Sequence, residues 1–65
     1  MERALNKILE IMFDMSQGIV DDDMADFYRG YLVALQENRE ITTGERLMLM
    51  NFYDRLVANK KFIAE

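Results

Sequence analysis

Residues 42–53 read TTGERLMLMNFY, and this stretch decides the fold. Thr42 followed three residues later by Glu45 is the pattern of a capping box, in which two side chains satisfy backbone N–H groups at the start of a helix. The apolar residues that follow predict an α-helix. Four consecutive apolar residues, 47–50, exceed what one helix face can hold, because successive residues lie about 100° apart. They indicate that this helix has a second buried surface.

Two earlier segments have the same periodicity, so the sequence predicts helices at about 2–17, 22–38 and 43–61. The second begins with carboxylates, where the helix dipole favours negative charge, with Asp21 or Asp22 as N-cap. Short connections favour antiparallel neighbours, and we expect one all-α, three-helix domain over residues 1–65. The expected core stripes are Leu5, Ile8, Leu9, Met12 and Met15; Met24, Phe27, Tyr28, Tyr31, Leu32 and Leu35; and Leu49, Phe52, Tyr53, Leu56 and Ile63.

Glycines mark two further features of the predicted helices. Gly18 fits the left-handed residue just after a helix, with Ile19 folding back on Phe13. Gly30 weakens the interior of the second helix, but with Ala34 one turn later it makes a notch of small residues. Another helix could approach closely at this notch.

The composition favours a folded chain that associates. The sequence has 65 residues, 51% of them hydrophobic, with no proline, cysteine or histidine. A domain this small is marginally stable and commonly needs disulfides, a metal or oligomerisation. Without cysteine or histidine, oligomerisation is the remaining option, and we expect a homodimer formed through the third helix and the broad apolar face of the first.

Charge and hydropathy exclude several partners. The net charge is −4, and residues 21–40 carry most of the excess acid, whereas a nucleic-acid binder usually has a basic patch. Charged residues interrupt every apolar run before it reaches membrane-spanning length, and the first residues show no signal-peptide pattern. We therefore expect a soluble cytoplasmic protein that binds neither membranes nor nucleic acid directly.

The residues that catalysis and cofactors need are scarce. No histidine can activate a hydroxyl, and the isolated glycines form no phosphate-binding loop. The acidic run from Asp21 does not match a calcium loop, because Asp26 stands at the sixth position and Leu32 at the twelfth. The sequence thus predicts no enzyme activity, cofactor, metal or small-molecule substrate.

Two groups of residues are candidate contacts for a protein partner. Leu47 and Met50, with Val57, are placed outside the main stripe of the third helix, and contiguous exposed apolar residues mark interaction sites. Ile11 and Val33 extend this predicted interface on the other helices. The second group is an acidic docking patch of Asp21, Asp22, Asp23 and Asp26, for which helix capping is the alternative explanation.

Two fragments, residues 23–28 (DMADFY) and 50–55 (MNFYDR), resemble pieces of the Hha/YmoA class of small helical nucleoid-associated modulators. They cover under a quarter of the chain. Their separation departs from that class, and there is no tryptophan near the C-terminus. The resemblance implies a transcription-modulating adaptor as one possible role.

The residue pattern predicts a small acidic, non-enzymatic protein-binding module that modulates or inhibits a larger protein by occupying its surface. One alternative is a regulatory adaptor acting on a DNA-binding or nucleoid-associated protein. In that case the acidic patch would meet a basic surface, and binding would weaken with salt. Another alternative is a purely self-associating structural module.

Overall fold

The computed structural model contains three helices, α1 (Glu2–Gln17), α2 (Asp22–Glu37) and α3 (Thr43–Ala64). It describes the backbone of residues 2–64 and the side chains of residues 6–60. The prediction of an all-α chain of three helices is confirmed, and α3 continues three residues past the expected end. Leu5 and Ile63, which were expected in the core stripes, lie outside the described side chains.

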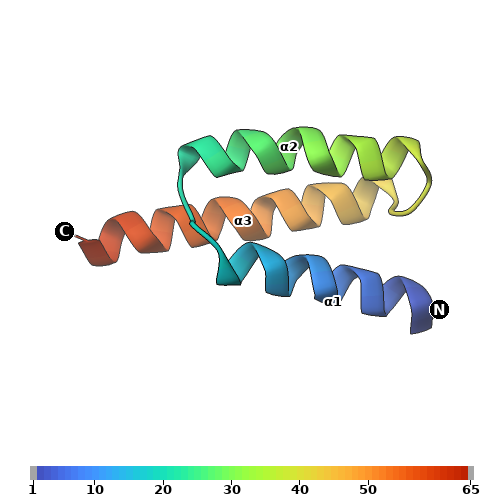
Figure 1. Cartoon of the computed structure of the whole chain (residues 1–65), viewed down its shortest axis with the longest axis horizontal. Helices are drawn as coiled ribbons and strands as arrows, with labels where there is room; N and C mark the ends of the chain where they lie inside the picture. The colour runs from blue at the N-terminus through green and yellow to red at the C-terminus, as the bar shows by residue number, and fades with distance from the viewer. Residues whose placement is uncertain (1, 65) are drawn as a thin grey trace.

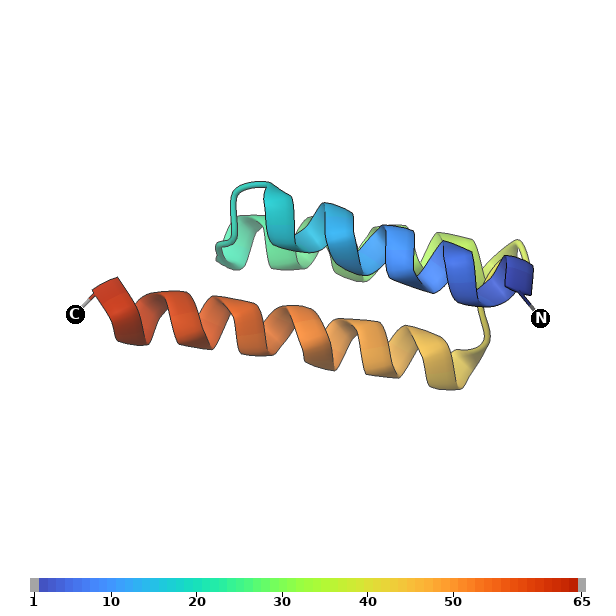
Figure 2. The ribbon, with the colours of Figure 1, turned by 90° about the horizontal axis from the view of Figure 1, so that it is seen from below.

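The helices run up, down and up, and α3 lies between the other two (Figure 1). Both α1 and α2 contact α3, whereas no Cα atoms of α1 and α2 approach within 8 Å of each other in the described chain. Figure 2 shows that α1 and α2 lie on the same side of α3. The opposite side of α3 therefore faces solvent, and α3 also extends past the α1–α2 connection (Figure 1).

The core runs along the seam where the three helices meet. Tyr53, Leu49 and Leu32 are fully buried, and Met15 of α1 joins them. The remaining buried residues are Ile8, Ile11, Ala25, Leu35, Ile41 and Val57. Burying a large apolar side chain stabilises the fold by about 1.5–3 kcal/mol, so this seam supplies most of the favourable free energy.

The predicted helix starts are confirmed. The Asp21 carboxylate accepts a 2.8 Å hydrogen bond from the Met24 N–H and is the N-cap of α2. At α3, the Thr42 hydroxyl accepts from the Glu45 N–H at 3.1 Å, and the Glu45 carboxylate accepts from the Thr42 N–H at 2.8 Å. These reciprocal bonds are the capping box, which satisfies two N–H groups that the helix leaves unpaired.

The prediction for the end of α1 is wrong. Gly18 does not adopt a positive φ, and Ile19 is 68% exposed instead of folding back onto Phe13. The reason is tertiary: the Tyr53 hydroxyl of α3 donates a 3.1 Å hydrogen bond to the Ile19 carbonyl. That bond holds the connection in place while the Ile19 side chain points to solvent.

The left-handed helix end is found instead after α2, at Arg39, whose φ is 62°. The Arg39 N–H donates to the Gln36 carbonyl at 3.0 Å, and the Glu40 N–H donates to the Leu35 carbonyl at 2.9 Å. This bond pair is a Schellman motif, which usually has glycine at the left-handed position. An arginine at this position has a conformational free-energy cost, because a left-handed φ crowds its Cβ atom.

The molecule is thin and elongated, with extents of 40 × 21 × 17 Å. Its radius of gyration is 12.1 Å, compared with about 11 Å for a compact domain of this length. Its accessible surface of 4955 Å² also exceeds the roughly 4300 Å² typical of a monomer of this mass. No helix in the described part is long and apolar enough to cross a membrane.

Candidate protein interfaces

The predicted patch of Leu47, Met50 and Val57 is not one surface. Leu47 is 56% exposed, but Met50 is partly buried against the core and Val57 is buried at 6% exposure. The placement of Val57 outside was wrong because the buried residues of α3 recur every four positions, at Leu49, Tyr53 and Val57. The predicted Phe52 and Leu56 are partly buried against this core, so contact with two helices widens the stripe to include Val57.

The structure separates the two residues that were expected to extend this interface. Ile11 is buried at 3% exposure, so it belongs to the core and offers no surface in the monomer. Val33 is 38% exposed on α2 and remains available to a partner. Ile11 is therefore not available for an interface unless the core opens.

Several large apolar side chains of α1 and α3 are exposed, among them Leu47, which the sequence placed outside the core, and Leu9, which it placed inside. On α1 these are Leu9 and Phe13, one turn apart; on α3 they are Leu47 and Met48. We call these four the outer apolar residues. Lys7 of α1 forms an ion pair with Glu40, and Asp14 of α1 interacts with Tyr28. The flank of α1 that carries Lys7 and Asp14 therefore faces α2. Helical spacing then places Leu9 and Phe13 on the opposite flank.

A second exposed group consists of aromatic rings on α2. Phe27 is 59% exposed and Tyr31 is 38% exposed, and their rings are parallel with centroids 6.0 Å apart. Tyr28 contacts both rings edge-on, and its own ring lies 4.9 Å from that of the buried Tyr53. The sequence predicted these rings in the core. Instead they extend from the core to the surface, because the α1 and α2 backbones are too far apart to cover them.

Burial changes the acidity of two of these phenols. Burial raises the pKa of Tyr28, and the neighbouring Tyr53 and Asp14 raise it further. Burial is the largest effect on Tyr53 and raises its pKa; a backbone hydrogen bond from Asp21 lowers this pKa, and the Asp21 charge raises it again, so the net direction is upward. Both phenols are therefore neutral in the folded protein at physiological pH.

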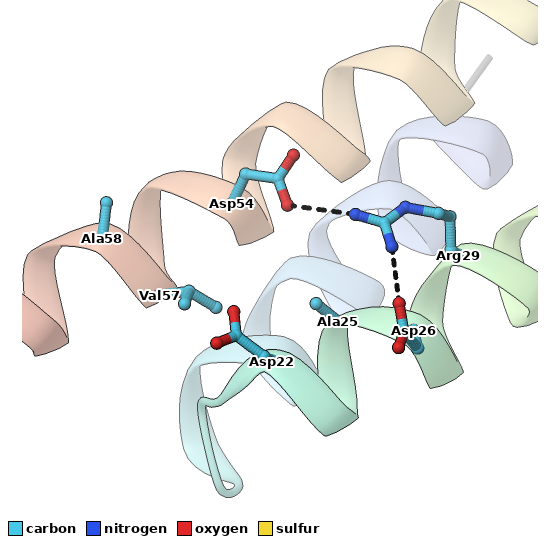
Figure 3. Close-up of a pocket in the computed structure, with 7 residues that line it drawn as sticks. All are labelled: Asp22, Ala25, Asp26, Arg29, Asp54, Val57 and Ala58. Atoms are coloured by element: carbon cyan, nitrogen blue, oxygen red, sulfur yellow. Dashed lines mark hydrogen bonds and ion pairs between the residues drawn. The ribbon is translucent and has the colours of Figure 1, made fainter.

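Acidic residues of α2 and α3 surround a hollow of about 350 Å³ (Figure 3). Arg29 bridges the two helices: its guanidinium lies 2.7 Å from Asp26 and 3.8 Å from Asp54. The apolar part of the lining comes from Ala25, Val57 and Ala58, and Asp22 completes the rim. Three carboxylates and one guanidinium leave the hollow net negative, which suits a basic side chain of a partner.

The structure brings only part of the predicted acidic patch together. Asp22 and Asp26 line the hollow, Asp21 caps α2, and Asp23 is exposed. Asp54 is an acidic residue of this site that the sequence reading missed. Its position on a different helix gave no local signal, since only the packing of α2 on α3 places it near Arg29. Among the described residues, no group of carboxylates is arranged to hold a metal ion.

Comparison of the chain with protein-family models, curated proteins and solved structures finds no match. The resemblance of the two short fragments to the Hha/YmoA class therefore gains no support.

Proposed function

We propose that this chain is a small acidic, non-enzymatic protein-binding module that modulates or inhibits a larger protein by occupying its surface. One observation carries the proposal: large apolar side chains remain exposed on all three helices of a chain that has more surface than its mass requires. Contiguous exposed apolar groups, such as Leu9 and Phe13 one turn apart, are typical of interaction sites.

The outer apolar residues are the proposed contact. They need no rearrangement of the core to become available, because all four side chains are already exposed in the monomer. Burying one such side chain contributes roughly 1.5–3 kcal/mol before association costs, so two or three supply useful affinity.

The test is quantitative affinity capture from the native host with the intact protein. Leu47→Ser with Met48→Ser should remove a protein that the wild-type chain retains, while Asn51→Ser with Arg55→Ser on the same helix should retain it. Circular dichroism must show that both variants keep their helices. Capture that is equal for both variants, or no protein retained by the wild type, would contradict the proposal. Fractionation of host cells checks the further expectation of a cytoplasmic location.

The negatively charged hollow favours a second candidate function, a regulatory adaptor on a DNA-binding protein. Such proteins present basic surfaces, and a lysine or arginine could insert between Asp22, Asp26 and Asp54. This partner would dissociate as salt rises, and Asp26→Asn with Asp54→Asn would weaken its capture. A partner held through the outer apolar residues would respond to neither change.

We also propose that the chain forms a homodimer. The thin shape leaves each helix with one side uncovered, and self-association would remove apolar surface that a single copy cannot bury. If dimerisation were the whole role, the chain would be a structural module without another partner. Sedimentation equilibrium over a range of concentrations measures this state, and a strict monomer at high micromolar concentration would refute it.

A further inference from the structure

We infer that the homodimer is domain-swapped: α1 of each copy leaves its own chain and occupies, on α3 of the other copy, the place that it holds in the monomer. This inference rests on the self-association proposed above and names its interface. The structure itself shows what covers that surface of α3, because Ile8, Ile11 and Met15 of α1 are buried in the core that α1 forms with α3. Exchange of an identical element is a low-cost route to a dimer, since both states make the same contacts.

The helix α1 is attached to the rest of the chain on one side only. It contacts α3, whereas no Cα atoms of α1 and α2 approach within 8 Å of each other in the described chain. Its polar contacts include an exposed ion pair, in which Lys7 lies 3.6 Å from Glu40, and the bond from Tyr53 to Ile19 at the connection. An element that packs on one neighbour separates more readily than one that packs on two. Therefore α1 is the helix whose departure disturbs the fold least.

Residues 18–21, which we call the hinge, are less firmly specified than the connection between α2 and α3. Gly18 has no positive φ, and residues 18–20, all of which the structure describes, donate no backbone hydrogen bond outside the helices. The later connection instead has the left-handed Arg39 with its Schellman bonds and a capping box. Asp21 is already extended, with φ −154° and ψ 178°, and the two β-branched residues before it favour extended backbone. Straightening the hinge therefore breaks no backbone hydrogen bond that closes a turn.

The area that a stable dimer needs favours exchange over contact between two intact surfaces. A helix of 16 residues such as α1 is about 24 Å long. One uncovered face of such a helix supplies less than the ~1200–2000 Å² of a stable interface. Exchange instead makes the whole buried contact between α1 and α3 intermolecular, and two-fold symmetry does so twice. The dimer thus has an interface with the character of a core.

The hinge also supplies a contact that the monomer lacks. Ile19 is 68% exposed, and in the exchanged dimer the two hinges pass each other near the two-fold axis, where each Ile19 side chain is covered by the other copy. The acidic starts of both α2 helices meet at this end. Asp22 shares a hollow with Val57, which places Lys60, about one turn farther along α3, at the same end. The ends that meet therefore carry charges of both signs.

Closure within one chain competes with exchange. Because the hinge is short, α1 meets its own α3 at a high effective concentration, and the exchanged dimer is expected to become abundant only on the order of 100 µM. It should form slowly, since α1 must leave one core before it enters another. The outer apolar residues do not take part in the exchanged contact and stay free for another protein.

Mixed isotope labels test the exchange in the intact chain. Unlabelled and ¹⁵N-labelled chains are unfolded together in urea and refolded at about 500 µM, and dimer and monomer are then separated by size exclusion. A carbodiimide joins Lys7 to Glu40 as an amide, because their side chains lie 3.6 Å apart, and mass spectrometry reads the labels of the linked peptides. Roughly half of these peptides from the dimer should carry both labels, the statistical share for exchange. The monomer is the control and should give peptides of a single label.

A substitution in the hinge separates exchange from contact between intact surfaces. Ile19→Ser should raise the dimer dissociation constant at least about tenfold in sedimentation equilibrium, because the hinge contact is lost, and it should leave the exposed site of the monomer folded. The matched control, Leu47→Ser at an exposed residue of α3, should leave the dissociation constant unchanged.

The two experiments also distinguish the failure of exchange from the failure of self-association. If the dimer gives only peptides of a single label, or if Leu47→Ser dissociates it and Ile19→Ser does not, exchange is wrong and self-association stands. If the wild type is monomeric throughout, both fail. The capture experiment remains a separate test of partner binding.

Discussion

The hydroxyl of Tyr53 on α3 donates a 3.1 Å hydrogen bond to the backbone carbonyl of Ile19, which lies 34 residues earlier. Tyr53 is fully buried, and its hydroxyl bonds to the α1–α2 connection. This bond fixes the connection on α3 and so sets the position of both helices that it joins.

Replacing Tyr53 by phenylalanine removes that bond and keeps the ring. We expect the free energy of unfolding to fall by about 1 kcal/mol, the usual net value of one hydrogen bond. Tyr31→Phe, at an exposed ring, is the control and should change it by less than about 0.5 kcal/mol. Urea unfolding followed by circular dichroism measures both. Equal effects would show that the Ile19 contact contributes nothing to stability.

The raised pKa values of Tyr28 and Tyr53 predict a loss of stability at alkaline pH. Because both phenols hold their protons more tightly in the folded state, the unfolded chain loses protons first. The contribution of these two phenols to stability should be fully present below the ordinary tyrosine pKa of 10.0 and be lost as the pH rises above it. The double variant Tyr28→Phe/Tyr53→Phe should show a shallower decline. Thermal unfolding from pH 8 to 11 tests this, and parallel curves would contradict it.

Arg39 and Gly18 give a paired prediction on backbone conformation. Arg39→Gly should stabilise the protein by up to about 1 kcal/mol, because glycine adopts a positive φ without crowding a Cβ atom. Gly18→Ala should stabilise by about 0.4–1 kcal/mol, since a Cβ there lies at an ordinary 3.9 Å from the Asp14 carbonyl. Measurements at low micromolar concentration avoid effects on association. If Gly18→Ala destabilised the protein, Gly18 would have to adopt the positive φ that the sequence predicted.

Val57 and Leu47 test which side of α3 is buried. Val57→Ala removes two buried methyl groups and should cost about 1–2 kcal/mol, a large part of the few kcal/mol available to a domain of this size. Leu47→Ala should change the free energy of unfolding by less than about 0.5 kcal/mol, because its side chain is mostly in solvent. The reverse order in chemical denaturation would mean that α3 is rotated.

Sequence alone determined the elements of this protein whose causes are local. Two helix starts depend only on groups three residues apart: the capping box at Thr42 and Glu45 and the N-cap at Asp21. Each can therefore be predicted from a single short stretch of sequence. Helical periodicity located all three helices for the same reason. The acidic character of the start of α2 was also visible, although its role in capping and its role in a hollow could not be separated.

Tertiary structure alone decided which faces of these helices are buried. The apolar run at residues 47–50 indicated that α3 has a second buried surface, and α3 does contact two helices. The periodicity of a single helix could not show which sides of α3 these two contacts cover. The covered sides depend on where α1 and α2 lie, and their positions bury Val57 and Ile11 and leave Phe27 exposed. Gly18 keeps an ordinary φ beside the Ile19 carbonyl, which the Tyr53 hydroxyl binds, and the left-handed residue of the described chain is Arg39 at the end of α2.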